Sequence, residues 1–245
     1  MELAETIATR LVDVQARIRN ALRAAGRPRD AVRLVAVSKT FCLEHVRAAI
    51  EAGLEDLGEN KVQEALEKSA ATSSLPVTWH FIGHLQSNKA RKAAGAFDWI
   101  HSVDSVELLR RLNRAAADAG RRPQVLIQVD LAGEATKHGA TEDDVALLVA
   151  AAQACEHLEL RGLMTLPPWS PDPEAARPFF HRLATIRQQL LPTLERPDKF
   201  DQLSMGMSYD LEVAIAEGST MVRVGTALFG PRRPRVQKSS VPADK

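Results

Sequence analysis

Cysteine and aromatic residues are scarce in this chain of 245 residues. It has two cysteines, Cys42 and Cys155, and its aromatic residues make up 4% of the total. Two cysteines are too few for a disulfide framework, and so few aromatic rings argue against a base-stacking platform. The net charge is also small, because 32 basic and 31 acidic residues leave +1. Composition therefore gives no reason to expect a nucleic-acid partner.

Signals for membranes and secretion are missing as well. The sequence has no run of roughly 18 or more apolar residues, the length that a membrane-spanning helix needs. The N-terminal segment carries Glu2, Glu5 and Asp13 and lacks the apolar core of a secretory signal. We therefore expect a protein of the reducing cytoplasm that has no membrane partner.

What the chain does have is a regular alternation of strand and helix patterns. Apolar residues recur at helical spacing from Leu3 to Leu22, which predicts an N-terminal helix ended by Gly26 and Pro28. Strands are predicted over residues 32–38, 56–58, 77–82, 98–101, 125–129, 160–164, 202–204 and 221–224. Helices are predicted over residues 43–52, 61–70, 87–94, 141–152, 174–191 and 211–216, with one more capped by Asp104. Thr141 and Asp144 resemble a capping box.

Eight strand–helix units in succession favour one closed (β/α)8 barrel with an extra N-terminal helix. The alternative is an open doubly wound sheet, but no G-x-G-x-x-G pattern follows the first strand. Residues 1–230 are expected to form a single barrel domain. The polar segment 231–245 is expected to be a flexible tail.

Lys39 stands at the end of the first predicted strand. In strand alternation it follows Val35 and Val37, so it is expected to point into the mouth of the barrel. Apolar surroundings disfavour the charged ammonium, and a neutral amine can attack a carbonyl. The alternative is a lysine whose stem packs on the protein while its ammonium reaches water.

The ends of the last two predicted strands are rich in serine, threonine and glycine. Gly206 and Ser208 follow strand seven, and Gly225 and Thr226 follow strand eight. Loops at these positions commonly bind phosphate in barrels, and Ser208 is placed where the next helix would start. Two such clusters on adjacent strands favour an anion site over mere turn and capping residues.

Two other polar residues lie at predicted strand positions. Arg223, on strand eight, is expected either to donate to a bound cofactor or to form a buried ion pair with Glu59 or Asp201. His80 and His84 flank a strand end without any known metal-binding motif, so no metal site is expected. His80 is interpreted as a hydrogen-bonded core histidine.

The segments LVAVSKT, LGENKVQEA, WHFIGHLQSNK, LSMGMSYDLEVAI and GSTMVRVGTALFG, spread over residues 34–230, are similar to the YggS/PROSC family of pyridoxal phosphate homeostasis proteins. The resemblance implies a fold-type III protein that binds pyridoxal 5'-phosphate (PLP), with a barrel like that of alanine racemase. Lys39 would form the Schiff base with PLP. The other cofactor-binding residues implied are Asn60, His80, Ser204, Met207, Ser208, Arg223, Gly225 and Thr226.

The resemblance further implies a protein that buffers and supplies PLP without robust catalytic turnover. Its expected partners are PLP, PLP-dependent apo-enzymes and free amino acids. An amino acid racemase or lyase is the main alternative, and a cofactor-free Schiff-base aldolase is the second. Racemases of this type use a tyrosine from another domain as a second base, whereas Tyr209, the only tyrosine, lies in the phosphate-side segment. We expect no second domain and therefore a monomer.

Overall fold

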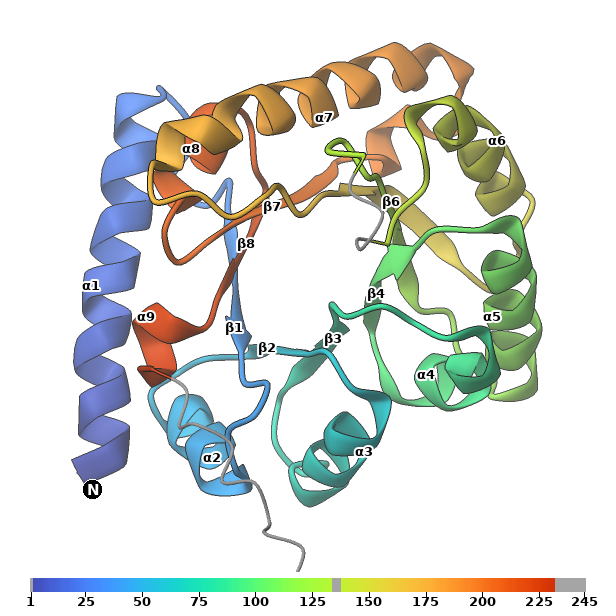
Figure 1. Ribbon diagram of the computed structural model, residues 1–245. Coiled ribbons are helices and arrows are strands. Elements are labelled where there is room, and N and C mark those ends of the chain that lie inside the picture. Colours follow the sequence, from blue (N-terminus) through green and yellow to red (C-terminus); the bar gives the residue numbers. More distant parts are fainter. Residues whose placement is uncertain (1, 134–137, 232–245) are drawn as a thin grey trace, which may run out of the picture.

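In the computed structural model, which describes residues 2–133 and 138–231, eight parallel strands close into a barrel in the order β1 to β8 (Figure 1). Each strand pairs with its neighbours in sequence, and β8 returns to pair with β1. The closed sheet confirms the predicted (β/α)8 barrel and excludes the open doubly wound sheet.

The strands are short and the helices follow them in regular order. The strands are β1 (Arg33–Val37), β2 (Asp56–Glu59), β3 (Thr78–Phe81), β4 (Trp99–Val103), β5 (Gln124–Gln128), β6 (Glu159–Met164), β7 (Gln202–Met207) and β8 (Met221–Val224). The α-helices are α1 (Glu2–Ala24), α2 (Leu43–Glu51), α3 (Val62–Ala71), α4 (Ala90–Ala96), α5 (Val106–Asp118), α6 (Glu142–Gln153), α7 (Arg177–Leu190), α8 (Leu211–Ala216) and α9 (Thr226–Phe229). Short 3-10 helices are η1 (Ser87–Lys89), η2 (Pro173–Ala176), η3 (Leu191–Thr193) and η4 (Pro197–Lys199).

The main hydrophobic core lies between the barrel and its ring of helices. Outward-facing strand residues such as Leu57, Ile100 and Val222 are fully buried there, together with helix residues such as Leu109 and Phe180. Burying apolar side chains of this size stabilises the fold by about 1.5–3 kcal/mol each. This layer holds the strand ends at fixed positions around the barrel mouth.

Helix α1 packs beside α8 and α9, on the side of the barrel that holds the last strands (Figure 1). Its buried face is the one that the apolar spacing predicts, and it consists of Ile7, Leu11, Val14, Ile18 and Leu22. Arg17 on α1 forms a bidentate ion pair with Glu212 on α8 and donates a third hydrogen bond to the backbone oxygen of Ser208. The extra helix therefore braces the loop that follows β7.

Several predicted element ends differ from the structure. Ser105, not Asp104, caps α5, because its side chain accepts a hydrogen bond from the backbone N–H of Leu108. Thr141 is the N-cap of α6, but its hydroxyl contacts Asp144 and makes no capping bond to the backbone. The predicted helices over residues 87–94 and 174–191 each begin with a 3-10 turn, η1 and η2, before the α-helix starts.

The largest difference concerns β7, which continues three residues beyond its predicted end at Ser204. Gly206 has φ of +92°, and a Cβ there would lie 2.5 Å from the Cβ of Ala214 on α8. Glycine therefore allows both the irregular pairing with β8 between Ser204 and Met207 and the close approach of α8. The short helix α9 was not predicted.

Within the described residues, no helix is both long and apolar enough to cross a membrane. Of the predicted tail, residues 232–245 lie outside the described part of the chain.

Candidate functional site

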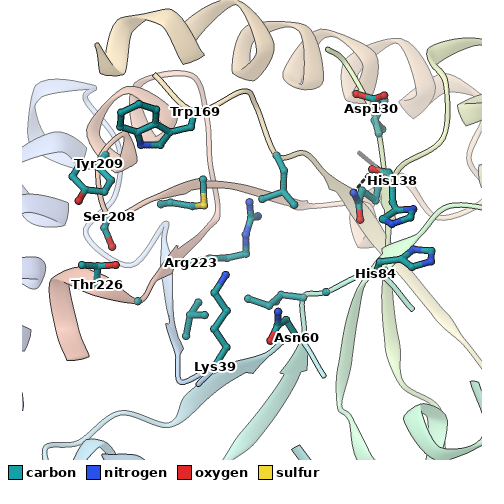
Figure 2. Close-up of a pocket in the computed structure, with 18 of the residues that line it drawn as sticks. Lys39, Asn60, His84, Asp130, His138, Trp169, Ser208, Tyr209, Arg223 and Thr226 are labelled. Carbon is teal, nitrogen blue, oxygen red and sulfur yellow. Dashed lines mark hydrogen bonds between the residues drawn. The ribbon is translucent and has the colours of Figure 1, made fainter. Parts of the chain in front are cut away.

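A cavity of about 460 Å³ opens at the carboxyl end of the barrel, where the predicted strand ends meet. Lys39, Asn60, Met207, Ser208, Arg223, Gly225 and Thr226 all line it. Figure 2 shows Lys39 extending into this space toward Arg223, with Ser208 and Thr226 facing each other on one side. The structure thus brings together seven of the nine residues expected at the site.

Lys39 sits in a strained turn at the end of β1. The backbone N–H of Phe41 donates to the oxygen of Ser38 at 3.1 Å, so Lys39 and Thr40 are the two central residues of the turn. Thr40 has φ of +73°, a region that β-branched residues rarely adopt. Such strain costs about 1–3 kcal/mol and is typical of functional sites.

A buried ion pair stabilises the backbone of this turn. Lys68 on α3 donates to a carboxylate oxygen of Glu59 at 2.5 Å and to the backbone oxygen of Ser38 at 3.0 Å. The hydroxyl of Ser38 donates to the same carboxylate oxygen at 2.7 Å. Glu59 is fully buried, so removing one partner of this pair would leave an uncompensated charge. The network fixes the backbone that carries Lys39.

Ser208 and the start of α9 form the side of the cavity next to β1, since α9 follows β8 and β8 pairs with β1. The backbone N–H of Ala227 donates to Ser208 Oγ at 3.3 Å. A Cβ on Gly225 would lie 3.3 Å from the backbone oxygen of Val37, so a larger residue would press on β1. The sequence predicted Ser208 at the start of the next helix, but α8 begins at Leu211. Its hydroxyl instead faces the first turn of α9, whose first backbone N–H groups have no partner within the helix.

Arg223 forms part of the cavity wall although it is only 3% exposed. Its guanidinium donates to Ser204 Oγ at 2.6 Å and to the backbone oxygen of Thr165 at 2.9 Å. Burial lowers the pKa of Arg223 to about 10, and the charge of Asp210 opposes that shift. The side chain therefore remains a cation at neutral pH.

Glu59 and Asp201, the two alternative ion-pair partners expected for Arg223, pair with other residues. Glu59 pairs with Lys68, and Asp201 pairs with Arg161 at 2.9 Å. The guanidinium of Arg223 instead donates to Ser204 and to the backbone of Thr165 in the barrel interior.

His80 and Ser204 do not line the cavity. Both are fully buried in the barrel interior, where their strand positions direct them. His80 lies 2.9 Å from a nitrogen of His101 and 2.8 Å from a carboxylate oxygen of Asp56. Ser204 contacts His101 and Arg223. His80 is a hydrogen-bonded core histidine, as interpreted from the sequence. The resemblance also implied that it binds the cofactor, but it does not line the cavity.

Asn60 contributes an unsatisfied acceptor. Its Oδ1 atom is buried and has no hydrogen-bond partner among the described residues. A buried amide oxygen without a donor is costly, and Asn60 lines the cavity. The atom is therefore placed to accept a hydrogen bond from a bound molecule.

The rim opposite Ser208 carries His84, Asp104 and His138, whose ligand atoms lie within 4.8 Å of one another. Sequence reasoning did not link them, because they come from three separate loops. The two imidazole rings stack with centroids 3.5 Å apart and an interplanar angle of 12°. In this arrangement the nitrogen lone pairs lie in nearly parallel planes and do not converge on one ion. The expectation of no metal stays a prediction.

Other cavity residues were not among those predicted to form the site. Trp169, 74% exposed, and Tyr209, 64% exposed, lie at the mouth (Figure 2). Gln128 is the last residue of β5 and Asp130 follows that strand. The side chain of Gln128 donates to the backbone oxygen of His138. A polar residue at a strand end is a weak signal, and the loop after β6 that holds Trp169 has no distinctive pattern.

The fold and the site together define a (β/α)8 barrel of the alanine racemase N-terminal type. The family model described as alanine racemase, N-terminal domain, matches residues 11–233. An alanine racemase of Clostridium difficile superposes with a TM-score of 0.71 at 15% identity, over 94% of this chain and 58% of that chain. At such low identity the likeness shows the fold alone.

Closer relatives narrow the class. The pyridoxal phosphate homeostasis protein of Pseudomonas aeruginosa is 48% identical over 228 residues, which cover 93% of this chain and 96% of that protein. The structure of PipY from Synechococcus elongatus with PLP bound has a TM-score of 0.80 at 40% identity, over 91% of this chain and all of that chain. This chain belongs to the family of pyridoxal phosphate homeostasis proteins, which confirms the resemblance seen in its sequence.

Proposed function

We propose that this protein binds PLP in the cavity at the barrel mouth, holds it through Lys39, and buffers and supplies it inside the cell. One observation carries the proposal: a lysine amine, a buried guanidinium and the hydroxyls of Ser208 and Thr226 line the same cavity. Relatives of similar length bear the name of PLP homeostasis proteins, and a solved relative is described with PLP bound.

The residues present fit this cofactor. A cavity of about 460 Å³ is within the usual range for a small ligand. The hydroxyls of Ser208 and Thr226, with the backbone around Gly225, suit a phosphate. The buried Oδ1 of Asn60, which has no partner among the described residues, suits a ring hydroxyl. Arg223 offers a donor to a pyridine nitrogen.

When bound, PLP supplies an aldehyde that a primary amine captures reversibly with loss of water. The strained turn and the Glu59–Lys68 pair hold Lys39 so that its amine enters the cavity. Ser208 and Thr226 bind and orient the phosphate group. Free amino acids would compete with Lys39 for the aldehyde, which allows release and reloading.

Arg223 supports a carrier role over an enzymatic one. With a pKa of about 10, its guanidinium keeps its proton at neutral pH and does not protonate a ring nitrogen. A pyridine ring without that proton withdraws electrons less, which disfavours catalysis at the α-carbon of an amino acid. We infer that the protein acts as a cytoplasmic monomer and that PLP-dependent apo-enzymes and free amino acids are its partners.

The test is an absorption spectrum of the purified protein with PLP, before and after borohydride reduction, followed by mapping of the modified lysine. The wild-type protein should show a visible imine band and carry the modification on Lys39. Lys39→Ala should lack both, whereas Lys61→Ala, which removes a lysine outside this cavity, should keep both. Modification of a different lysine in the wild-type protein would contradict the proposed attachment.

An amino acid racemase remains the second candidate, because the matching family model is named for one. Incubation with alanine in deuterated water separates the two functions. A carrier should exchange the α-proton slowly, without sustained turnover. Multiple turnovers that disappear in Lys39→Ala would favour the enzyme.

A further inference from the structure

A continuous line of polar side chains crosses the interior of the barrel. Arg223 donates to Ser204 Oγ at 2.6 Å, and Ser204 Oγ lies 2.9 Å from His101 Nδ1. His101 Nε2 lies 2.9 Å from His80 Nδ1, and His80 Nε2 lies 2.8 Å from Asp56 Oδ1. We call these five residues the buried chain. It begins at the cavity and ends at the first residue of β2, at the opposite end of the barrel.

The carboxylate at the far end fixes the direction of the hydrogen bonds along the buried chain, and the guanidinium at the cavity is compatible with that direction. A guanidinium can only donate, and an ionised carboxylate can only accept. Burial would raise the pKa of Asp56, yet the hydrogen bond from His80 and the charge of Arg33 keep that pKa below its ordinary value. Asp56 is therefore the acceptor at neutral pH, and the hydrogen must lie on the Nε2 atom of His80.

Both histidines in the buried chain are neutral, because burial lowers the pKa of His80 and lowers that of His101 further. A neutral imidazole with hydrogen on Nε2 accepts at Nδ1. His80 Nδ1 thus accepts from His101 Nε2, and His101 Nδ1 accepts from the hydroxyl of Ser204. All donors point from the cavity toward Asp56, and both histidines hold the same tautomer.

This direction matters for the cation at the cavity. A buried guanidinium needs strong acceptors, and a hydroxyl accepts better when it donates its own proton onward. Ser204 therefore accepts more strongly from Arg223 while its own hydroxyl proton is donated to His101 Nδ1. Asp56 secures that arrangement, although it lies at the other end of the barrel.

The charged groups around the far end leave this arrangement intact. Arg33 on β1 contacts Asp56 at 3.0 Å, and it also lies over the ring of Trp99, which stacks on His80. Asp98 accepts from the backbone N–H of Trp79 and pairs with Arg121. Asp98 thus adds a negative charge near His80 without entering the buried chain.

We propose that Asp56 is a positioning residue for the ligand cavity, which acts through His80, His101 and Ser204 to orient the guanidinium of Arg223. Asp56 touches no ligand in this role. The orientation of the Arg223 guanidinium requires no ligand. Only its relevance to PLP binding rests on the function proposed above.

Nitrogen-15 NMR of the ligand-free protein tests the proposal directly. In the wild-type protein, both histidines should carry hydrogen on Nε2, and the guanidinium hydrogens of Arg223 should exchange slowly with water. In Asp56→Asn the neutral carboxamide is a weaker acceptor for His80 than the carboxylate and can also turn its NH2 group toward His80, so the direction of the chain is no longer enforced. The exchange of the Arg223 hydrogens should then speed up by about tenfold, the effect of losing one hydrogen bond.

Asp98→Asn is the matched control, because it removes a carboxylate near His80 that is not part of the buried chain. It should leave both tautomers and the Arg223 exchange rate unchanged. Ser204→Ala interrupts the chain beside Arg223 and should reproduce the faster exchange if Asp56→Asn does not fold. Hydrogen on Nδ1 of either wild-type histidine, or unchanged Arg223 exchange in both chain variants, would overturn the proposal.

A second arm measures the PLP absorption band and equilibrium affinity of the same variants. Asp56→Asn should shift the band and weaken binding several-fold, whereas Asp98→Asn should not. Since the NMR arm needs no ligand, it tests the buried chain even if the wild-type protein fails to bind PLP. That failure would contradict the proposed function alone.

Discussion

The outer face of the barrel strands is apolar, whereas the inner face combines polar and apolar residues. Outward positions, such as Ala36, Phe81 and Val125, are apolar and belong to the large core beneath the helices. Inward positions alternate with them and include His80 and Arg223. A small separate cluster of Trp99, Leu126, Met164 and Met221 supplies the apolar part of the interior.

The difference shows how stability and function are divided within one sheet. Side chains on successive strand residues point to opposite faces, so each strand contributes to both regions. The outer face buries apolar area and holds the barrel closed. The inner face carries charges and hydrogen bonds at a cost in stability, because buried polar groups must find partners. Variants on the two faces should therefore separate stability from ligand binding.

The largest effect is expected on the outer side. Phe180→Ala removes a fully buried ring of α7 from the main core and should reduce the free energy of unfolding by about 3–5 kcal/mol. Denaturant titration measures this loss. PLP affinity of the folded variant should stay near the wild-type value, and a parallel loss of affinity would break the proposed division between faces.

The cavity should respond in the opposite way. Ser208→Ala combined with Thr226→Ala removes two hydroxyls that line it, and hydrogen bonds to charged groups are worth about 1.5–3 kcal/mol. With both bonds lost, PLP affinity should fall roughly 100- to 10,000-fold while the unfolding midpoint changes little. Unaltered affinity, measured by fluorescence titration, would show that the phosphate is held elsewhere.

The inner face should also make the protein sensitive to acid. Burial lowers the pKa of His80 and His101, so below the unfolded pKa of about 6.5 the unfolded chain binds more protons than the folded one. Stability should be greatest above that pH and should fall as the pH drops, until the folded pKa values are reached. The slope is at most about 1.4 kcal/mol per pH unit for each histidine.

Urea unfolding across this pH range measures the slope. His101→Gln removes one titrating group of the interior and should flatten the profile. His181→Gln, which changes a largely exposed histidine on α7, serves as the control and should leave it unchanged. Equal slopes in all three proteins would mean that the buried histidines do not control the acid response.

The smallest effect concerns the strained turn at the rim. Thr40 has φ of +73°, a conformation that asparagine tolerates better than a β-branched residue. Thr40→Asn should therefore raise the free energy of unfolding by about 1 kcal/mol. Thr185→Asn within the regular helix α7 relieves no such strain and should bring no gain. A destabilised Thr40→Asn protein would argue that the turn is not strained.

Much of the fold could be predicted from the sequence, because each strand and most helices leave a local pattern. All eight predicted strands exist, and closure in sequence order follows from the alternation of strands and helices. Errors fell at element ends. The backbone conformation of Gly206 extends β7 past Ser204, and no apolar pattern reveals this.

The site was predictable to the extent that its residues stand at strand ends. Lys39, Arg223 and Thr226 meet in the cavity as expected. His80 lies within β3, and its depth below the cavity depends on the register of β3 with its neighbours. The link from Asp56 to Arg223 involves residues of five strands, β2, β3, β4, β7 and β8, and the linear sequence does not show which inward side chains meet.

The sequence by itself determined the alternation of elements, the apolar outer face of the barrel and the placement of a lysine and two serine- and glycine-rich segments at strand ends. These features can be read from the sequence because they depend on the spacing of apolar and polar residues over a few neighbouring positions. Only the tertiary structure decided which inward side chains touch, because barrel closure brings together residues far apart in the chain. The depth of each side chain in the barrel decides whether it binds a ligand or supports a residue that does.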